Sequence, residues 1–406
     1  MRTVERIPPI LIYFLISLST LTETIYSAAL PNITEDLNTH GSISQLSTTA
    51  YYSGFAVGIF TLGRISDTLG RKPVVIFGIS FYAVASLIIS YSPNIEVFIV
   101  LRFLQAYGAS VGSVVGQAMT RDSYKGWQLS YMYASLSMVV AVVPSIGSAI
   151  GGFIVEYSNW KTVFRFLAAI SSILLFIYIK FLPETNTYMS VAQNNKFINV
   201  LKIAIQDKKL VSYAFIVGIY NGICFGFYIQ APFIFIESLK MSPSSYGRLF
   251  LFLSGASLLG SFISKKLLTN FVNTFKVKIL GLILSSTGCI LLLVGSAMIS
   301  NDSNANTVVF LIFAPMTIYL MGHSLIVPML LRHALEDYYK VTGSAGAVFG
   351  SLYYIVTALI IFIISSIHSN NINNFAILSA TLIFICLILF YLTTKWKKII
   401  CKINFC

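Results

Sequence analysis

Charged residues are scarce in this chain. Asp, Glu, Lys and Arg make up 10% of its 406 residues, whereas a soluble globular domain carries about 25%. Hydrophobic residues account for 56% of the chain, and the mean hydropathy is +0.81. So few charges cannot cover a core of this apolarity with a water-facing surface. The composition therefore excludes a soluble protein and indicates one that lies within a lipid bilayer.

Cysteine is rare, and the patterns that carry metal or nucleotide chemistry are missing. The cysteines fall in apolar runs or in the C-terminal tail without zinc-type spacing, so neither disulfides nor a metal site is expected. No Gly-x-x-x-x-Gly-Lys-[Ser/Thr] sequence occurs, which argues against nucleotide hydrolysis. We expect no cofactor, no metal and no enzymatic activity. The five cysteines are Cys224, Cys289, Cys386, Cys401 and Cys406.

Long apolar runs are abundant. Each has about 20 residues, which is enough for a helix to cross a hydrocarbon core of roughly 30 Å. The runs predict an all-α membrane protein with twelve transmembrane helices. Six are expected at about 8–30, 44–63, 74–92, 97–119, 129–155 and 162–182, and six more at about 210–236, 246–264, 279–299, 307–331, 343–367 and 375–394.

Lys and Arg are distributed unevenly between the two sides of these spans. With the N-terminus inside, 22 of the 27 basic residues fall on the cytoplasmic side, as the positive-inside rule requires. The sequence thus predicts that both termini are cytoplasmic. The net charge of +13 follows from this topology and from anionic lipid headgroups, so no nucleic-acid partner is expected.

A polar connection divides the spans into two groups of six. We predict an N-terminal six-helix bundle over residues 1–182, a cytoplasmic linker over 183–209, and a C-terminal bundle with a cytoplasmic tail over 210–406. A weak internal repeat supports the division, since ALPNITEDL (29–37) and APFIFIESL (231–239) end the first span of each group. Chance similarity between two membrane segments is the alternative. Two such copies with a binding site between them are a common transporter design.

Several short motifs resemble those of a known family. GRISDTLGRKP (63–73) resembles the loop signature of the major facilitator superfamily, and the chain is similar over nearly its whole length to the drug:proton antiporter branch of bicyclomycin-resistance (Bcr/CflA-like) transporters. The resemblance implies two pseudo-symmetric six-helix bundles. The further motifs are RFLQAYGASVGSVV (102–115), NWKTVFRFL (159–167), LPET (182–185), QAPFIFIE (230–237), SPSSYG (242–247) and GSAGAVFGSL (343–352).

The 63–72 stretch is expected to form a charged turn that controls opening of the two halves. Its glycines permit tight turns, and its Asp can pair with a nearby Arg or cap a helix N-terminus. The resemblance implies that this Asp faces the start of the eleventh span, near Thr342, Gly343 and Ser344. The alternative is that the basic residues serve only as topology determinants. The gating residues are Gly63, Arg64, Asp67, Gly70, Arg71 and Lys72.

Two charged residues lie inside spans, where an ionisable group costs at least about 2.5–3.5 kcal/mol and indicates function. Glu23 and Arg102 both lie roughly 10–12 Å below the outer surface at 1.5 Å per residue, so they can share a layer. To carry a proton, Glu23 must be neutral in part of the cycle, which a persistent pair with Arg102 opposes. We expect the two to approach in only some states. A fixed structural ion pair is the alternative.

The chain departs from the antiporter pattern at two places. The branch often carries an Asp near the end of its first span, and alignment on Tyr26 and Pro31 places Thr24 at that position. Glu23 is rotated from it by about 100° of helix, so Glu23 can point beside the usual cavity. In the fifth span, VVPSIGSAIGG (142–152) resembles the antiporter motif but has Val143 and Ser148 for two glycines. The retained packing residues are Pro144, Gly147, Gly151 and Gly152.

Polar and aromatic residues at mid-span positions predict the substrate cavity, because polar groups in lipid need partners. His323 is a third candidate for proton coupling, since imidazole titrates near neutrality. A helix–helix hydrogen bond is its alternative role. Most of the other aromatic residues fit interfacial belts. The cavity candidates are Tyr26, Asn221, Tyr228, Gln230 and Tyr319.

Together these patterns predict a proton-coupled secondary transporter that works by alternating access in a bacterial cytoplasmic membrane. Efflux of small amphiphilic drugs, or of a secreted metabolite such as a siderophore, is the leading function. Proton-coupled uptake of a metabolite is the alternative, and a non-transporting receptor or scaffold is a remote one. The expected partners are a small-molecule substrate, protons and the bilayer, and the expected state is a monomer.

Overall fold

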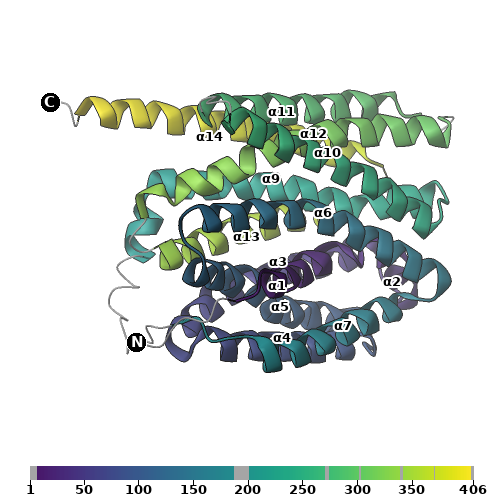
Figure 1. Cartoon of the computed structure of the whole chain (residues 1–406). Helices are drawn as coiled ribbons and strands as arrows, with labels where there is room; N and C mark the ends of the chain where they lie inside the picture. Colours follow the sequence, from purple (N-terminus) through teal and green to yellow (C-terminus); the bar gives the residue numbers. More distant parts are fainter. Residues whose placement is uncertain are drawn as a thin grey trace.

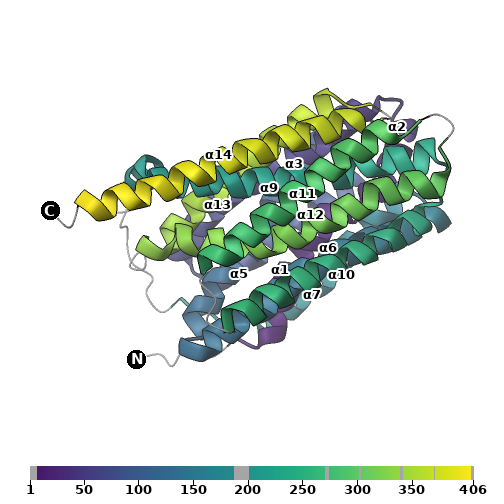
Figure 2. The same cartoon turned by 90° about the horizontal axis from the view of Figure 1, so that it is seen from above.

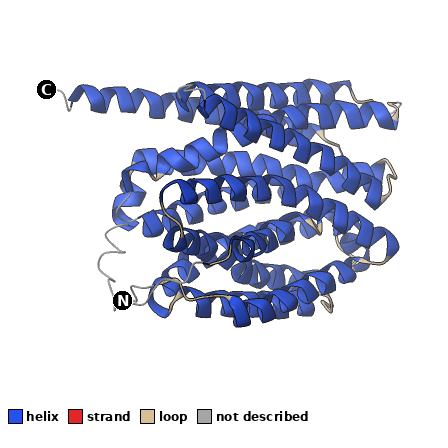
Figure 3. Cartoon of the chain, in the orientation of Figure 1, coloured by secondary structure: helices blue, strands red, loops and turns tan. Residues whose placement is uncertain are grey.

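A computed structural model describes residues 7–186, 201–269, 274–300, 303–338, 342–369 and 371–403. Within these ranges the chain is helical, with no strand (Figure 3). Part of the predicted linker, residues 187–200, and the last three residues of the predicted tail lie outside them. Residues 201–206 of the linker are helical.

Twelve long helices are present among the described residues, one for each predicted span, so the predicted fold class is confirmed. They are α1 (Pro9–Thr24), α3 (Gly41–Leu69), α4 (Arg71–Ile89), α5 (Ile95–Ser123), α6 (Gly126–Tyr157), α7 (Trp160–Phe181), α9 (Lys208–Pro232), α10 (Pro243–Thr269), α11 (Thr274–Met298), α12 (Ala305–Ala334), α13 (Thr342–Ser366) and α14 (Asn373–Ile403). Short helical turns extend three of them: η1 (Ser27–Ala29) and α2 (Leu30–Asp36) follow α1, η2 (Phe233–Ser238) follows α9, and η3 (Glu336–Tyr338) follows α12.

The helices run side by side in a layered bundle (Figures 1 and 2). In Figure 1, α11, α12 and α14 lie at one side and α4, α5 and α7 at the other, with α6, α9 and α13 between them. The two groups of six meet mainly along two helix pairs, α3 with α13 and α6 with α10. We name the two ends of the bundle cytoplasmic and outer after the predicted topology.

Eleven of the described helices are long and apolar enough to cross a membrane. The exception is α3, which carries buried polar side chains along the face that packs inside the protein. A helix enclosed by others needs less apolar surface than one facing lipid. Its polarity therefore reflects its place between the two halves.

The predicted turn over 63–72 is wrong in its extent. Helix α3 continues to Leu69 and α4 begins at Arg71, so a single residue separates them. Gly70 has φ of 101°, a backbone conformation that glycine adopts without a steric penalty. Gly63 lies inside α3, where a Cβ would come within 2.7 Å of Val114. Hydropathy marks where the bilayer ends, and these helices extend beyond it.

Candidate functional site

Glu23 is buried near the end of α1, on the side that faces the interface between the two halves. Its carboxylate interacts electrostatically with Tyr52 on α3, Cys224 on α9 and Tyr354 on α13. No hydrogen bond or ion pair of this carboxylate is found among the described residues. The carboxyl group is thus placed between both halves without a fixed partner.

Arg102 is fully buried on α5 and does not pair with Glu23. Its guanidinium carbon lies 3.9 Å from the ring centroid of Tyr26 and 4.4 Å from that of Tyr51, a cation–π arrangement. Nη1 donates to Oε1 of Gln105, while Nε and Nη2 have no hydrogen-bond partner among the described residues. Both Glu23 and Arg102 interact electrostatically with Tyr51. Arg102 therefore stacks on two tyrosine rings, and a fixed ion pair with Glu23 is not observed among the described residues.

Thr24 is directed at α6. Its hydroxyl donates to the carbonyl oxygen of Pro144 at 2.6 Å. The same face of α6 packs against α1 through Gly147 and Gly151, where a Cβ would lie 2.7 Å from Oγ1 of Thr24 and 1.7 Å from the carbonyl oxygen of Ile25. The Thr24 side chain therefore packs α1 against α6, and the carboxyl group belongs to the neighbouring residue, Glu23.

An aromatic cluster fills the interface beside Glu23, and sequence reasoning missed it. Tyr52 stacks on Tyr354 with ring centroids 5.9 Å apart, and Tyr354 also contacts Phe55 at 4.7 Å. Tyr52 contacts Phe225 of α9 at 5.0 Å. Interfacial belts are the expectation for most aromatic residues of the chain, but Tyr52 lies well inside α3. Depth within a span was the signal that could have found them.

The other predicted cavity residues are separated into several places. His323 Nε2 lies 3.1 Å from Oδ1 of Asn221, joining α12 to α9, and the Tyr319 hydroxyl donates to the backbone of the same helix α9. Tyr228 contacts Ser145 of α6 at 3.5 Å. Tyr26 lies beneath Arg102. Within the described part of the chain, no group of three or more His, Cys, Asp or Glu could hold a metal ion.

Gln230 lies at the outer end and not in the central layer. It forms, with Gln45 of α3 and His368 after α13, a hydrogen-bonded cluster that we call the outer seal. Nε2 of Gln45 lies 3.1 Å from Oε1 of Gln230 and 3.0 Å from Nδ1 of His368. Burial lowers the pKa of His368, so the imidazole is neutral at pH 7 and can accept from Gln45. The outer seal joins the two halves.

A polar cluster holds the cytoplasmic ends of α3 and α4 together. Arg71 pairs with Asp67 at 2.6 Å and with Asp122 of α5 at 3.0 Å. The Glu184 carboxylate accepts hydrogen bonds from the backbone N–H groups of Arg71 and Lys72 at 2.9 and 3.0 Å. Glu184, which follows the neighbouring helix α7, therefore caps α4, a role that the sequence did not indicate.

The side chains of Thr342, Gly343 and Ser344, the expected partners of Asp67 on α13, lie outside the described part of the structure. Asp67 pairs with Arg71 in the described residues, and Arg64 is partly buried. A Cβ on Gly63 would lie 3.9 Å from Cβ of Ala347 near the start of α13. The end of α3 is thus close to the beginning of α13.

Replacement of Glu184 by Ala is expected to destabilise the protein by about 1 kcal/mol, because two backbone N–H groups lose their cap. Thermal unfolding of the purified protein in detergent measures the change. Glu35→Ala is the matched control, since Glu35 is exposed at the end of α2. Equal melting temperatures for the two variants would show that the cap contributes nothing.

The chain is similar in sequence to known bacterial proteins. The chain is 50% identical over 380 residues to a protein of Rickettsia bellii named "Uncharacterized transporter", covering 93% of this chain and 94% of that one. It is 25% identical over 344 residues to Multidrug resistance protein D of Escherichia coli K12, covering 84% of each. It is 36% identical over 151 residues to the Chloramphenicol resistance protein of Pseudomonas aeruginosa, covering 37% and 36%.

Solved structures show the same fold at low identity. The xylose transporter XylE of E. coli superposes with a TM-score of 0.71 at 11% identity, over 94% of this chain and 97% of that one. The family model of the Major Facilitator Superfamily matches residues 12–361. The family model matches most of the chain. The twelve helices and the relative that is 50% identical point to the same family. The chain therefore belongs to the Major Facilitator Superfamily, a family of secondary transporters.

Proposed function

We propose that the protein is a proton-coupled antiporter that expels small amphiphilic compounds from a bacterial cytoplasm. The observation that carries the proposal is Glu23, a buried carboxyl that has no ion pair among the described residues and interacts with groups of both halves. Such a group can bind a proton or a cationic substrate, but not both. Competition for one carboxyl couples the two fluxes in opposite directions.

The halves, residues 1–182 and 210–406, alternate around this site as a monomer in the cytoplasmic membrane. Opening on the outer side separates the outer seal, and opening on the cytoplasmic side separates α3 from the start of α13. The Asp67–Arg71 pair lies at that second contact. The names of the drug-resistance relatives support a drug-like substrate. The aromatic cluster supports an aromatic or cationic one.

Transport in proteoliposomes with an imposed pH gradient tests the proposal. Lipophilic cations are supplied on the inner side, and a pH-sensitive dye follows proton movement. Antiport predicts that added substrate drives protons in the opposite direction. Movement of both in the same direction would favour proton-coupled uptake instead, and the absence of any coupled flux would contradict both.

A further inference from the structure

One face of α3 carries three polar side chains, each with a buried atom that has no hydrogen-bond partner among the described residues. The atoms are Oε1 of Gln45, Oγ1 of Thr49 and the hydroxyl oxygen of Tyr52. The side chains of Gln45 and Tyr52 are fully buried. Spacings of four and three residues place the three positions within an arc of about 60° around the helix, at about 100° per residue. We call these three residues the α3 polar line.

The α3 polar line leads from the outer seal to Glu23. At its outer end, Nε2 of Gln45 lies 3.0 Å from Nδ1 of His368, a residue that is partly exposed. At its inner end, the Tyr52 phenol interacts electrostatically with Glu23. From Gln45 to Tyr52 the helix rises about 10 Å, at 1.5 Å per residue. Unpaired polar atoms thus recur between the outer surface and the buried carboxyl group.

The contacts of Gln45 show which of its amide atoms is unpaired. Nε2 lies 3.1 Å from the backbone oxygen of Ile229 and 3.1 Å from Oε1 of Gln230. A donor fits between two such acceptors and an oxygen does not, so the nitrogen occupies this position. Oε1 of Gln45 is therefore an acceptor that the outer seal does not use.

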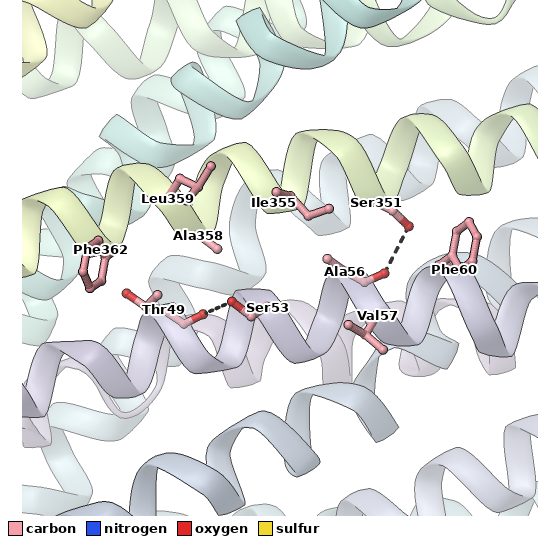
Figure 4. A pocket seen from close by; sticks show the side chains of 10 residues that line it. All are labelled: Thr49, Ser53, Ala56, Val57, Phe60, Ser351, Ile355, Ala358, Leu359 and Phe362. Atoms are coloured by element: carbon pink, nitrogen blue, oxygen red, sulfur yellow. Dashed lines mark hydrogen bonds between the residues drawn. The ribbon is translucent and has the colours of Figure 1, made fainter. Parts of the chain in front are cut away.

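A cavity of about 630 Å³ between α3 and α13 provides space beside Thr49 (Figure 4). Of its three lining hydroxyl groups, two are satisfied: Ser53 donates to the carbonyl oxygen of Thr49 at 2.8 Å, and Ser351 donates to that of Ala56 at 3.0 Å. The third belongs to Thr49. A water molecule needs about 15 Å³ and at least two polar partners. Because the rest of the lining is apolar, the place for water in this cavity is beside the Thr49 hydroxyl.

Water molecules can connect neighbouring members of the α3 polar line. Residues three or four apart on a helix have Cβ atoms about 5–6 Å apart, a gap that a bridging water spans with two hydrogen bonds. A buried polar atom without a partner costs free energy, so water at these positions is favoured over an empty or apolar surrounding. A hydrogen-bonded chain of water carries protons, because each molecule accepts one proton and releases another.

We propose that the α3 polar line holds a chain of water molecules that delivers protons from the outer side to Glu23. This inference rests on the proposed function and adds the route of the driving ion. A proton enters beside His368 and passes along the waters that the line holds. It then binds the Glu23 carboxylate, which becomes neutral. The amide and the two hydroxyl groups position water and keep their own protonation. A proton can enter while the outer seal is closed, whereas a substrate molecule requires the halves to separate.

Thr49→Val and Tyr52→Phe test the water chain, since each removes one hydroxyl group that has no partner among the described residues. Each variant should slow the exchange of ethidium for protons in proteoliposomes about tenfold, because each interrupts proton delivery. Equilibrium binding of ethidium should stay the same, because Glu23 is intact. The rate difference between H2O and D2O should increase, because proton delivery then limits exchange. Thr49→Ser keeps a hydroxyl group and should restore the rate.

Thr317→Val on α12 is the matched control. The Thr317 hydroxyl donates to the carbonyl oxygen of Phe313 in its own helix, so exchange should continue at the rate of the unaltered protein. Unchanged rates and isotope effects in both Thr49→Val and Tyr52→Phe would overturn the water chain and leave the proposed function intact. An equal loss of rate in Thr317→Val would also overturn it. If the unaltered protein exchanges neither ethidium nor tetraphenylphosphonium for protons, the proposed function itself fails.

Discussion

Glu23→Gln is expected to abolish proton coupling and to weaken binding of a cationic substrate, while the protein still folds. The amide is nearly the same size as the carboxyl group, but it neither gains nor loses a proton. Because the Glu23 side chain has no ion pair in the described structure, its replacement leaves no partner unsatisfied. Substrate-driven proton flux in proteoliposomes should fall by more than about tenfold, or about 1.4 kcal/mol.

Two further variants separate a proton carrier from a structural acid. Glu23→Asp retains a titratable group and should retain part of the coupling. Glu35→Gln removes an exposed acid on α2 and should change nothing. Proton flux that persists unaltered in Glu23→Gln would refute the role assigned to this residue. The candidate proton site would then move to His323, which is joined to Asn221.

Gly151→Ala is expected to disrupt the packing of α6 on α1. A Cβ at this position would lie 1.7 Å from the carbonyl oxygen of Ile25, and real atoms cannot approach so closely. The two helices must separate, and α1 carries Glu23. Overpacking of this kind costs about 1–3 kcal/mol. The melting temperature and the yield of monodisperse protein in detergent measure the loss.

Gly255→Ala is the control, for which the expected change in stability has the opposite sign. Gly255 lies within α10, and nothing is within 4 Å of a Cβ built on it. Alanine in an open helical position is favoured over glycine by about 1 kcal/mol. This variant should therefore be as stable as the unaltered protein or more so. A similar loss in both variants would mean that glycine is needed for reasons other than close approach.

Hydropathy predicted all twelve helices because lipid leaves few alternatives to a helix of about 20 apolar residues. It was less informative where helices leave the bilayer. Nothing in the apolar pattern shows that α3 continues through Arg64 and Asp67 to Leu69, since beyond the lipid a helix needs no apolar residues. The single-residue break at Gly70 depends on backbone geometry and not on polarity.

The charged residues of the candidate site could be identified from the sequence. Glu23 and Arg102 stood out because a charged group in a span is costly, and the structure buries both. Neutral residues such as Gln45 and His368 carry no such signal, and their contacts with Gln230 depend on how three helices pack. The sequence also does not show which way the Thr24 side chain points. Adjacent residues are about 100° apart around a helix, and only the position of the neighbouring helix shows which of them faces it.

The outer seal has a consequence for solvation. Nε2 of Gln45 holds the halves together at this point through hydrogen bonds to Gln230 and His368, each with a net contribution of about 0.5–1.5 kcal/mol. When the halves separate, water hydrates the freed amides and the imidazole at once. An apolar contact would instead lose about 25 cal/mol for each Å² exposed to water. Hydration thus compensates for separation here, so the outer end can open and close repeatedly with only a small change in free energy.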